Sequence, residues 1–85
     1  MDVMTQGYSK VCTESVAVAK WGVLALRSIR RDGSLPDFVV GRPGDKPMLE
    51  DDGRTLVLPL QEPAPKCYAA LNETGGVTLM TADEY

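Results

Sequence analysis

Hydrophobic and polar positions between Val11 and Arg31 follow the period of an α-helix. At 100° per residue, apolar side chains recur on one line of the helix surface and polar side chains on the opposite line. The apolar line consists of Val11, Val18, Ala25 and Ile29, and the polar line consists of Thr13, Lys20, Arg27 and Arg31. Read as a strand, the same residues give no clean alternation. The pattern therefore predicts an amphipathic helix over residues 11–31.

Both ends of this stretch support the helix. Thr13 or Ser9 can cap its N-terminus, and the arginines at its other end suit the negative end of the helix dipole. Gly33 suits the left-handed conformation that commonly follows a helix. The dipeptide Asp32-Gly33 is also typical of a tight turn, so a hairpin that leads into residues 37–40 is the alternative.

The remainder of the chain has the pattern of short strands separated by turns rich in Pro, Gly and Asp. The expected strands cover residues 37–40, 47–50, 54–60, 67–71 and 77–81. Turn residues at 51–53 and 72–76 predict two hairpins. Residues 62–65 predict an extended connector, and residues 82–85 predict a frayed tail. We expect one α+β domain over residues 1–85, in which one N-terminal amphipathic helix packs on a small, mostly antiparallel sheet of about four short strands.

The predicted helix carries more hydrophobic surface than one buried side requires. Val16, Val23 and Leu24 lie outside the apolar line and flank the basic positions. Either a small domain buries its one helix broadly, or this flank contacts a second copy or another protein. Trp21 lies between the two sides, so we expect it to be half-exposed, either as the rim of the core or as the anchor of an interface. The predicted partner-binding residues are Val16, Lys20, Trp21, Val23, Leu24, Arg27 and Arg31.

The chain is acidic overall, but its charge is unevenly distributed. Residues 1–46 carry seven Lys or Arg and five Asp or Glu, whereas residues 47–85 carry two and seven. Because phosphate contacts need a basic field, a net charge of −3 argues against a nucleic-acid partner. No run approaches the roughly 20 apolar residues of a membrane span, so no membrane association is expected. The partner expected is another protein or a second copy of this chain, which would make a homodimer or a larger oligomer.

The start of the chain lacks the basic and then apolar pattern of a secretory signal. We therefore expect a cytoplasmic location, which for a viral protein means the cytoplasm of the host cell. Cys12 and Cys67 are then expected to be reduced, buried thiols. A single bridge between them is the alternative.

The sequence lacks the side chains that most catalytic sites require. It contains no histidine, which excludes Ser-His-Asp and Cys-His catalysis and imidazole-based zinc sites. The acidic residues 50–52 do not follow the ligand pattern of a calcium loop. Residues 41–47 resemble a phosphate loop only superficially, because Pro47 follows Lys46 where such a loop has Ser or Thr. We expect no catalytic, metal or cofactor site and no enzymatic activity.

These observations favour a small, non-enzymatic protein-binding module that acts as an adaptor, a regulator or an inhibitor of a larger protein. Compact acidic proteins of this size are common among inhibitors encoded by viruses and mobile elements, so such an origin fits this class. The alternative is a self-assembling structural subunit, such as a coat or decoration protein, built through exposed strand edges. Two further hypotheses are an enzyme that uses Cys12 as nucleophile and a nucleic-acid binder that uses the basic line of the helix.

Overall fold

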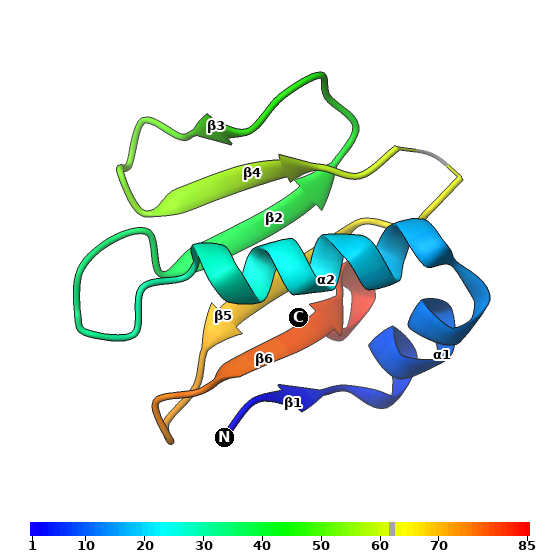
Figure 1. Ribbon diagram of the computed structural model, residues 1–85, viewed down its shortest axis with the longest axis horizontal. Coiled ribbons are helices and arrows are strands. Elements are labelled where there is room, and N and C mark those ends of the chain that lie inside the picture. Colours follow the sequence, from blue (N-terminus) through cyan, green and yellow to red (C-terminus); the bar gives the residue numbers. More distant parts are fainter. Residues whose placement is uncertain (62) are drawn as a thin grey trace.

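The longer of two helices lies across one face of a six-stranded sheet, and the shorter one lies at an end of that sheet, in the computed structural model, which describes residues 1–61 and 63–85 (Figure 1). Helix α1 spans Gln6–Glu14 and helix α2 spans Val16–Ser28. The strands are β1 (Val3–Met4), β2 (Phe38–Arg42), β3 (Met48–Leu49), β4 (Thr55–Pro59), β5 (Cys67–Leu71) and β6 (Val77–Thr81). A 3-10 helix, η1, covers Ala82–Glu84.

The sheet has the strand order β1-β6-β5-β2-β4-β3. Strand β5 is antiparallel to β2 and β6, and β3 is antiparallel to β4, whereas β1 is parallel to β6 and β2 is parallel to β4. The predicted combination of helix and sheet is confirmed in outline. The finer prediction of one helix and about four mostly antiparallel strands needs correction. Parallel pairs join strands that are distant in the chain, so no local turn signal reveals them.

The two predicted hairpins are present. Strands β5 and β6 have the predicted bounds, and their turn contains Gly75 with a φ of 81°. Strands β3 and β4 pair around Gly53, which has a φ of 70°. Strand β2 begins one residue later than predicted and continues through Gly41 to Arg42. The predicted connector over residues 62–65 includes Glu62, which lies outside the described residues.

Instead of the one helix predicted over residues 11–31, the structure has two helices, because the helical conformation is interrupted at Ser15. Ser15 has extended backbone angles, and its Oγ accepts a hydrogen bond from the Val18 N–H at 3.3 Å. A serine at this position satisfies an N–H that has no partner within the new helix. Thr5 caps α1 in the same way through the Tyr8 N–H, so neither Ser9 nor Thr13 is a cap. The second helix ends at Ser28, three residues earlier than predicted.

Trp21 lies in the core between α2 and the sheet, and the prediction of a half-exposed side chain is wrong. It is 2% exposed, and its Nε1 donates a hydrogen bond to the Leu58 carbonyl at 3.2 Å. Its ring packs against Gly41 of β2, where a Cβ would come within 2.7 Å of ring atoms. The absence of a side chain at Gly41 therefore makes room for the indole.

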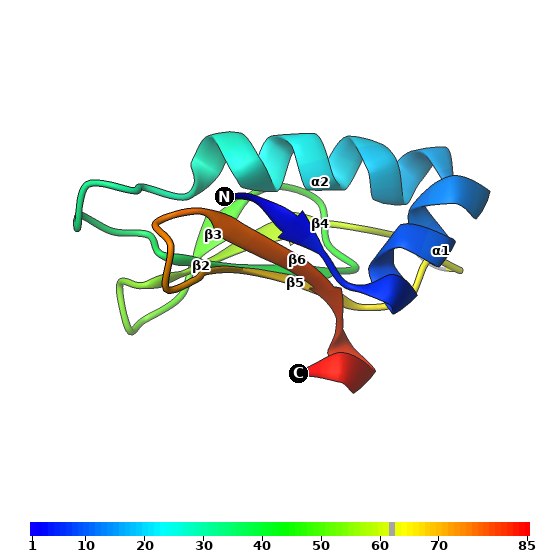
Figure 2. The same ribbon diagram turned by 90° about the horizontal axis from the view of Figure 1, so that it is seen from below.

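The C-terminal residues fold as η1 and are not frayed. The Glu84 carboxylate accepts hydrogen bonds from the Thr81 N–H at 3.1 Å, from the Gly7 N–H at 3.0 Å and from the Thr5 hydroxyl. These contacts join the end of the chain to the N-terminus of α1. Figure 2 shows η1 on the side of the sheet opposite α2.

Candidate functional site

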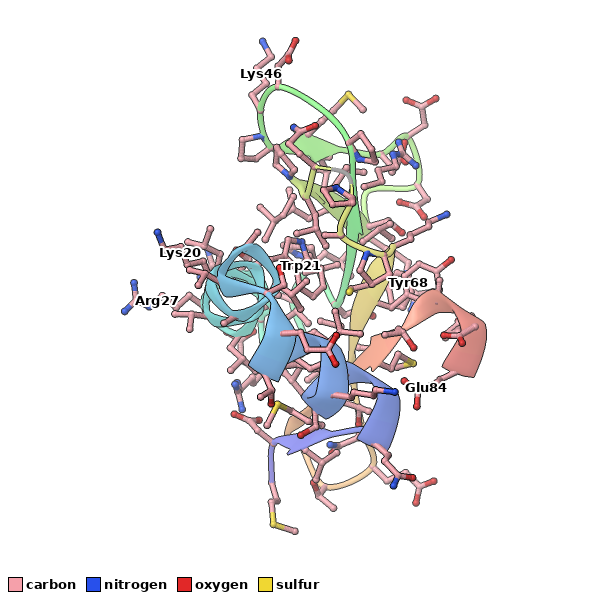
Figure 3. All side chains as sticks on the ribbon, turned by 90° about the vertical axis from the view of Figure 1, so that its right-hand side faces the viewer. Lys20, Trp21, Arg27, Lys46, Tyr68 and Glu84 are labelled. Atoms are coloured by element: carbon pink, nitrogen blue, oxygen red, sulfur yellow. The ribbon has the colours of Figure 1, made fainter. Side chains whose placement is uncertain are left out.

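One side of α2 faces away from the sheet and carries aliphatic and basic side chains together. Val16, Val23 and Leu24 are 71%, 49% and 51% exposed. Lys20 and Arg27 are also exposed, and both point away from the sheet (Figure 3). We call these five residues the α2 outer face. The structure thus brings together five of the seven predicted partner-binding residues, along about three turns of one helix.

The direction of the α2 outer face follows from the buried side of the same helix. Val18, Trp21, Gly22 and Ala25 are buried, and α2 contacts β2, β4 and β5. Residues three or four apart share one side of a helix. Packing these four residues on the sheet therefore turns the α2 outer face to solvent. Its aliphatic side chains are not needed for the core.

The other two predicted binding residues lie elsewhere. Trp21 is a core residue, as described above. Arg31 follows the end of α2, and its guanidinium donates hydrogen bonds to the Asp2 carboxylate at 2.7 and 3.1 Å. This contact is the main cause that lowers the pKa of Asp2. Arg31 therefore ties the first residues of the chain to the end of α2, and the predicted polar line does not continue as one exposed surface.

A hollow of about 300 Å³ lies beside the α2 outer face, between the end of α1 and the start of α2. Its lining consists of Cys12, Thr13, Glu14, Val16, Ala19, Lys20 and Val23. Three of these residues belong to the α2 outer face. The aliphatic surface therefore continues into a depression that can receive a side chain from another molecule.

The two cysteines are free thiols, so the alternative of a bridge between them is not realised. Cys67 is buried in the core, and this burial raises the pKa of its thiol to about 11. Cys12 is half-buried in the last turn of α1. Cys12 therefore does not lie in the first turn of a helix, where the helix dipole can activate a thiol.

A second, partly exposed surface, which the sequence pattern did not predict, lies on the face of the sheet opposite α2. The rings of Phe38, Tyr68 and Tyr85 have centroids 5.0–5.7 Å apart. The Lys66 ammonium lies 5.6 Å from the centroid of the Tyr68 ring. We call these three rings the aromatic cluster. Strand alternation places Phe38 on this face, but only the register of β2 with β5 shows that Tyr68 is its neighbour.

The described residues give no indication of a membrane span or a metal centre. None of the helices among them is long and apolar enough to cross a bilayer. In the same residues, no three His, Cys, Asp or Glu side chains are grouped in a way that could hold a metal ion.

Comparison with known proteins gives no match. No family model fits the chain, and neither a curated protein nor a solved structure is significantly similar to it.

Proposed function

We propose that this protein is a non-enzymatic protein-binding module, a regulator or an inhibitor, that contacts its partner through the α2 outer face. The observation that carries the proposal is the exposure of Val16, Val23 and Leu24 on a helix whose core side is already complete. Exposed aliphatic residues that are grouped on one rigid element and rimmed by polar residues are typical of interaction sites. The neighbouring hollow adds a position for an anchoring side chain.

The available chemistry supports a binding role over an enzymatic one. The chain has no histidine to act as a general base near neutral pH. Cys67 is buried with a raised pKa, so little of it is thiolate at neutral pH. The net charge of −3 supports a protein partner over a nucleic acid.

Affinity capture from the cells that produce the protein tests the proposal. We expect the wild type to retain a partner that the double variant Val23→Ser/Leu24→Ser loses. The matched control is Met48→Ser/Leu49→Ser, which removes a similar exposed aliphatic pair from β3. Capture that is unchanged by the α2 variant but lost in the β3 variant would contradict the proposal. Trp21→Ala is unsuitable here, because it would disturb the core.

A self-assembling structural subunit is the second candidate function, and the two sheet edges favour it. Strands β1 and β3 form the edges, and each exposes two large apolar residues: Val3, Met4, Met48 and Leu49. Exposed apolar edges can pair with the same edge of another copy. Size-exclusion chromatography with light scattering separates the two candidates, because only self-assembly predicts a mass above that of the monomer at high concentration.

A further inference from the structure

Three of the nine basic residues form ion pairs among the described residues, and Lys20 and Arg27 are among the six that do not. Arg31, Arg42 and Arg54 each form an ion pair, at 2.7, 2.8 and 2.9 Å. Within residues 1–61 and 63–85, no ion pair involves Lys20 or Arg27. The α2 outer face therefore presents two unpaired positive charges beside three exposed aliphatic side chains.

Aliphatic and basic side chains alternate along the α2 outer face. Val16, Lys20, Val23 and Arg27 follow the spacing i, i+4, i+7 and i+11, so they lie on one line, with Leu24 beside it. The line extends over about 16 Å at 1.5 Å per residue. An aliphatic ridge with cations at regular intervals is complementary to a helix that has apolar residues on one face and carboxylates beside them.

We propose that the α2 outer face binds an acidic amphipathic helix of a partner protein. This inference rests on the proposed protein-binding function and adds the chemistry of the partner. Aliphatic residues of the partner helix cover Val16, Val23 and Leu24, and one of its side chains enters the hollow beside α1. Aspartate or glutamate residues on the partner's flanks pair with Lys20 and Arg27.

A nucleic acid, an anionic membrane and a second copy of this chain are each less complementary to the α2 outer face. A nucleic acid would pair with the cations but leave the aliphatic side chains without apolar contacts, and the net charge of −3 repels it. The same net charge opposes binding to an anionic bilayer, and the α2 outer face has no aromatic residue of the kind that sits at membrane interfaces. A second copy that packs the same face on itself would bring four cations together, and Glu14 is the one acidic residue that lines the hollow beside them.

Titration of the ¹⁵N-labelled full chain with two synthetic peptides tests the inference by NMR. Both peptides have 18 residues and the same leucine face. One carries glutamate on its flanks, and the other carries glutamine at the same positions. We expect the acidic peptide to shift the amide signals of residues 16–27 and to bind at least tenfold more tightly than the glutamine peptide. Binding should weaken as NaCl is raised from 50 to 500 mM.

Two exposed-site variants identify the contacts. We expect Lys20→Glu/Arg27→Glu to abolish binding of the acidic peptide, and Val23→Ser/Leu24→Ser to weaken it at least tenfold. Because these residues are exposed, the amide spectrum of each free variant should match that of the wild type outside α2. The control Met48→Ser/Leu49→Ser should bind the acidic peptide like the wild type.

The outcomes separate this inference from the proposed function. Equal binding of the two peptides at residues 16–27, lost in Val23→Ser/Leu24→Ser but unchanged in Lys20→Glu/Arg27→Glu, would overturn the acidic partner and leave the proposed function standing. If the amide signals of residues 16–27 shift when the protein concentration is raised without peptide, the occupant of the α2 outer face is a second copy, and the acidic partner is overturned. If the protein binds phosphatidylserine vesicles but not the acidic peptide, the occupant of the α2 outer face is a membrane, and the acidic partner is overturned. No shift of residues 16–27 with either peptide would overturn the acidic partner, whereas the proposed function would fall only if capture from cells were also insensitive to Val23→Ser/Leu24→Ser.

Discussion

At the scale of single residues, Gly41 determines where the largest side chain of the core can lie. The Trp21 indole occupies the space above Gly41, and its Nε1 reaches the Leu58 carbonyl. The helical pattern places Trp21 between the buried and exposed sides of α2, so it cannot decide between them. The contact that buries Trp21 joins two elements that are distant in sequence. Helical periodicity describes each helix separately, so it cannot predict this contact.

Gly41→Ala is expected to destabilise the protein by about 1–3 kcal/mol, because the new methyl group overlaps a rigid, buried ring. Gly44→Ala is the matched control, since a Cβ there meets nothing within 4 Å. Urea unfolding, followed by the fluorescence of Trp21, measures both variants. A Gly41→Ala variant as stable as Gly44→Ala would show that the indole does not pack on β2 as described.

At the scale of elements, Ser15 illustrates which features of the fold can be predicted from the sequence. The apolar line correctly identifies Val18, Ala25 and Ile29 as core residues. It does not reveal the break, because residues on both sides of Ser15 continue the same period. A serine between two helical segments is compatible with an uninterrupted helix or with a new cap. In the structure Ser15 is a cap, and α1 contacts both α2 and β6.

Ser15→Ala is expected to lower the free energy of unfolding by about 1 kcal/mol through loss of the N-cap of α2. Ser9→Ala is the control, because Ser9 lies inside α1 and alanine favours a helix interior. Thermal or urea unfolding compares the two. Equal stability of both variants would mean that Ser15 does not cap α2.

The Glu84 carboxylate joins the 3-10 helix η1 to the N-terminus of α1, and this makes the docking of η1 sensitive to acid. Hydrogen bonds from the Thr5 hydroxyl and from Thr81 lower the pKa of Glu84 to about 2, from an ordinary value of 4.5. The folded state therefore favours the ionised carboxylate. Its contribution to stability is present above about pH 4.5 and is lost as the pH falls towards 2.

Glu84→Gln should reduce stability near neutral pH and should make the decline between pH 4.5 and pH 2 shallower than in the wild type. The matched control Glu73→Gln, at an exposed site in the β5–β6 turn, should follow the wild-type curve. Urea midpoints measured from pH 2 to pH 7 test this. Identical curves for wild type and Glu84→Gln would contradict the contact between Glu84 and α1.

The strands divide into those that local signals can predict and those that they cannot. Strands β5 and β6 form a hairpin with alternating buried and partly exposed residues, and their bounds follow from the sequence. Strand β1 has only two residues and exists through its parallel pairing with β6. No two-residue pattern predicts a strand. The same reasoning applies to the parallel pairing of β2 with β4.

At the scale of the whole molecule, exposed or partly exposed apolar residues gather on the α2 outer face, in the aromatic cluster and at the two opposite edges of the sheet. The sequence identified the first, because helical periodicity separates a surplus of aliphatic residues from the core line. It missed the second, because the aromatic cluster depends on the register between strands. The α2 outer face combines exposed aliphatic residues, two cations outside the ion pairs of the described residues, and a hollow. For this reason we propose it as the partner-binding surface.

Photo-crosslinking in the native cell tests this assignment most directly. A benzoylphenylalanine placed at Val23 would report contacts of the α2 outer face, and the same residue placed at Met48 would report contacts of the β3 edge. Both positions are about half exposed, so both variants should fold. We predict that position 23 forms a crosslink to a different protein and that position 48 does not. A crosslink to a second protein only from position 48, or a crosslink from position 23 only to another copy of this chain, would contradict the account.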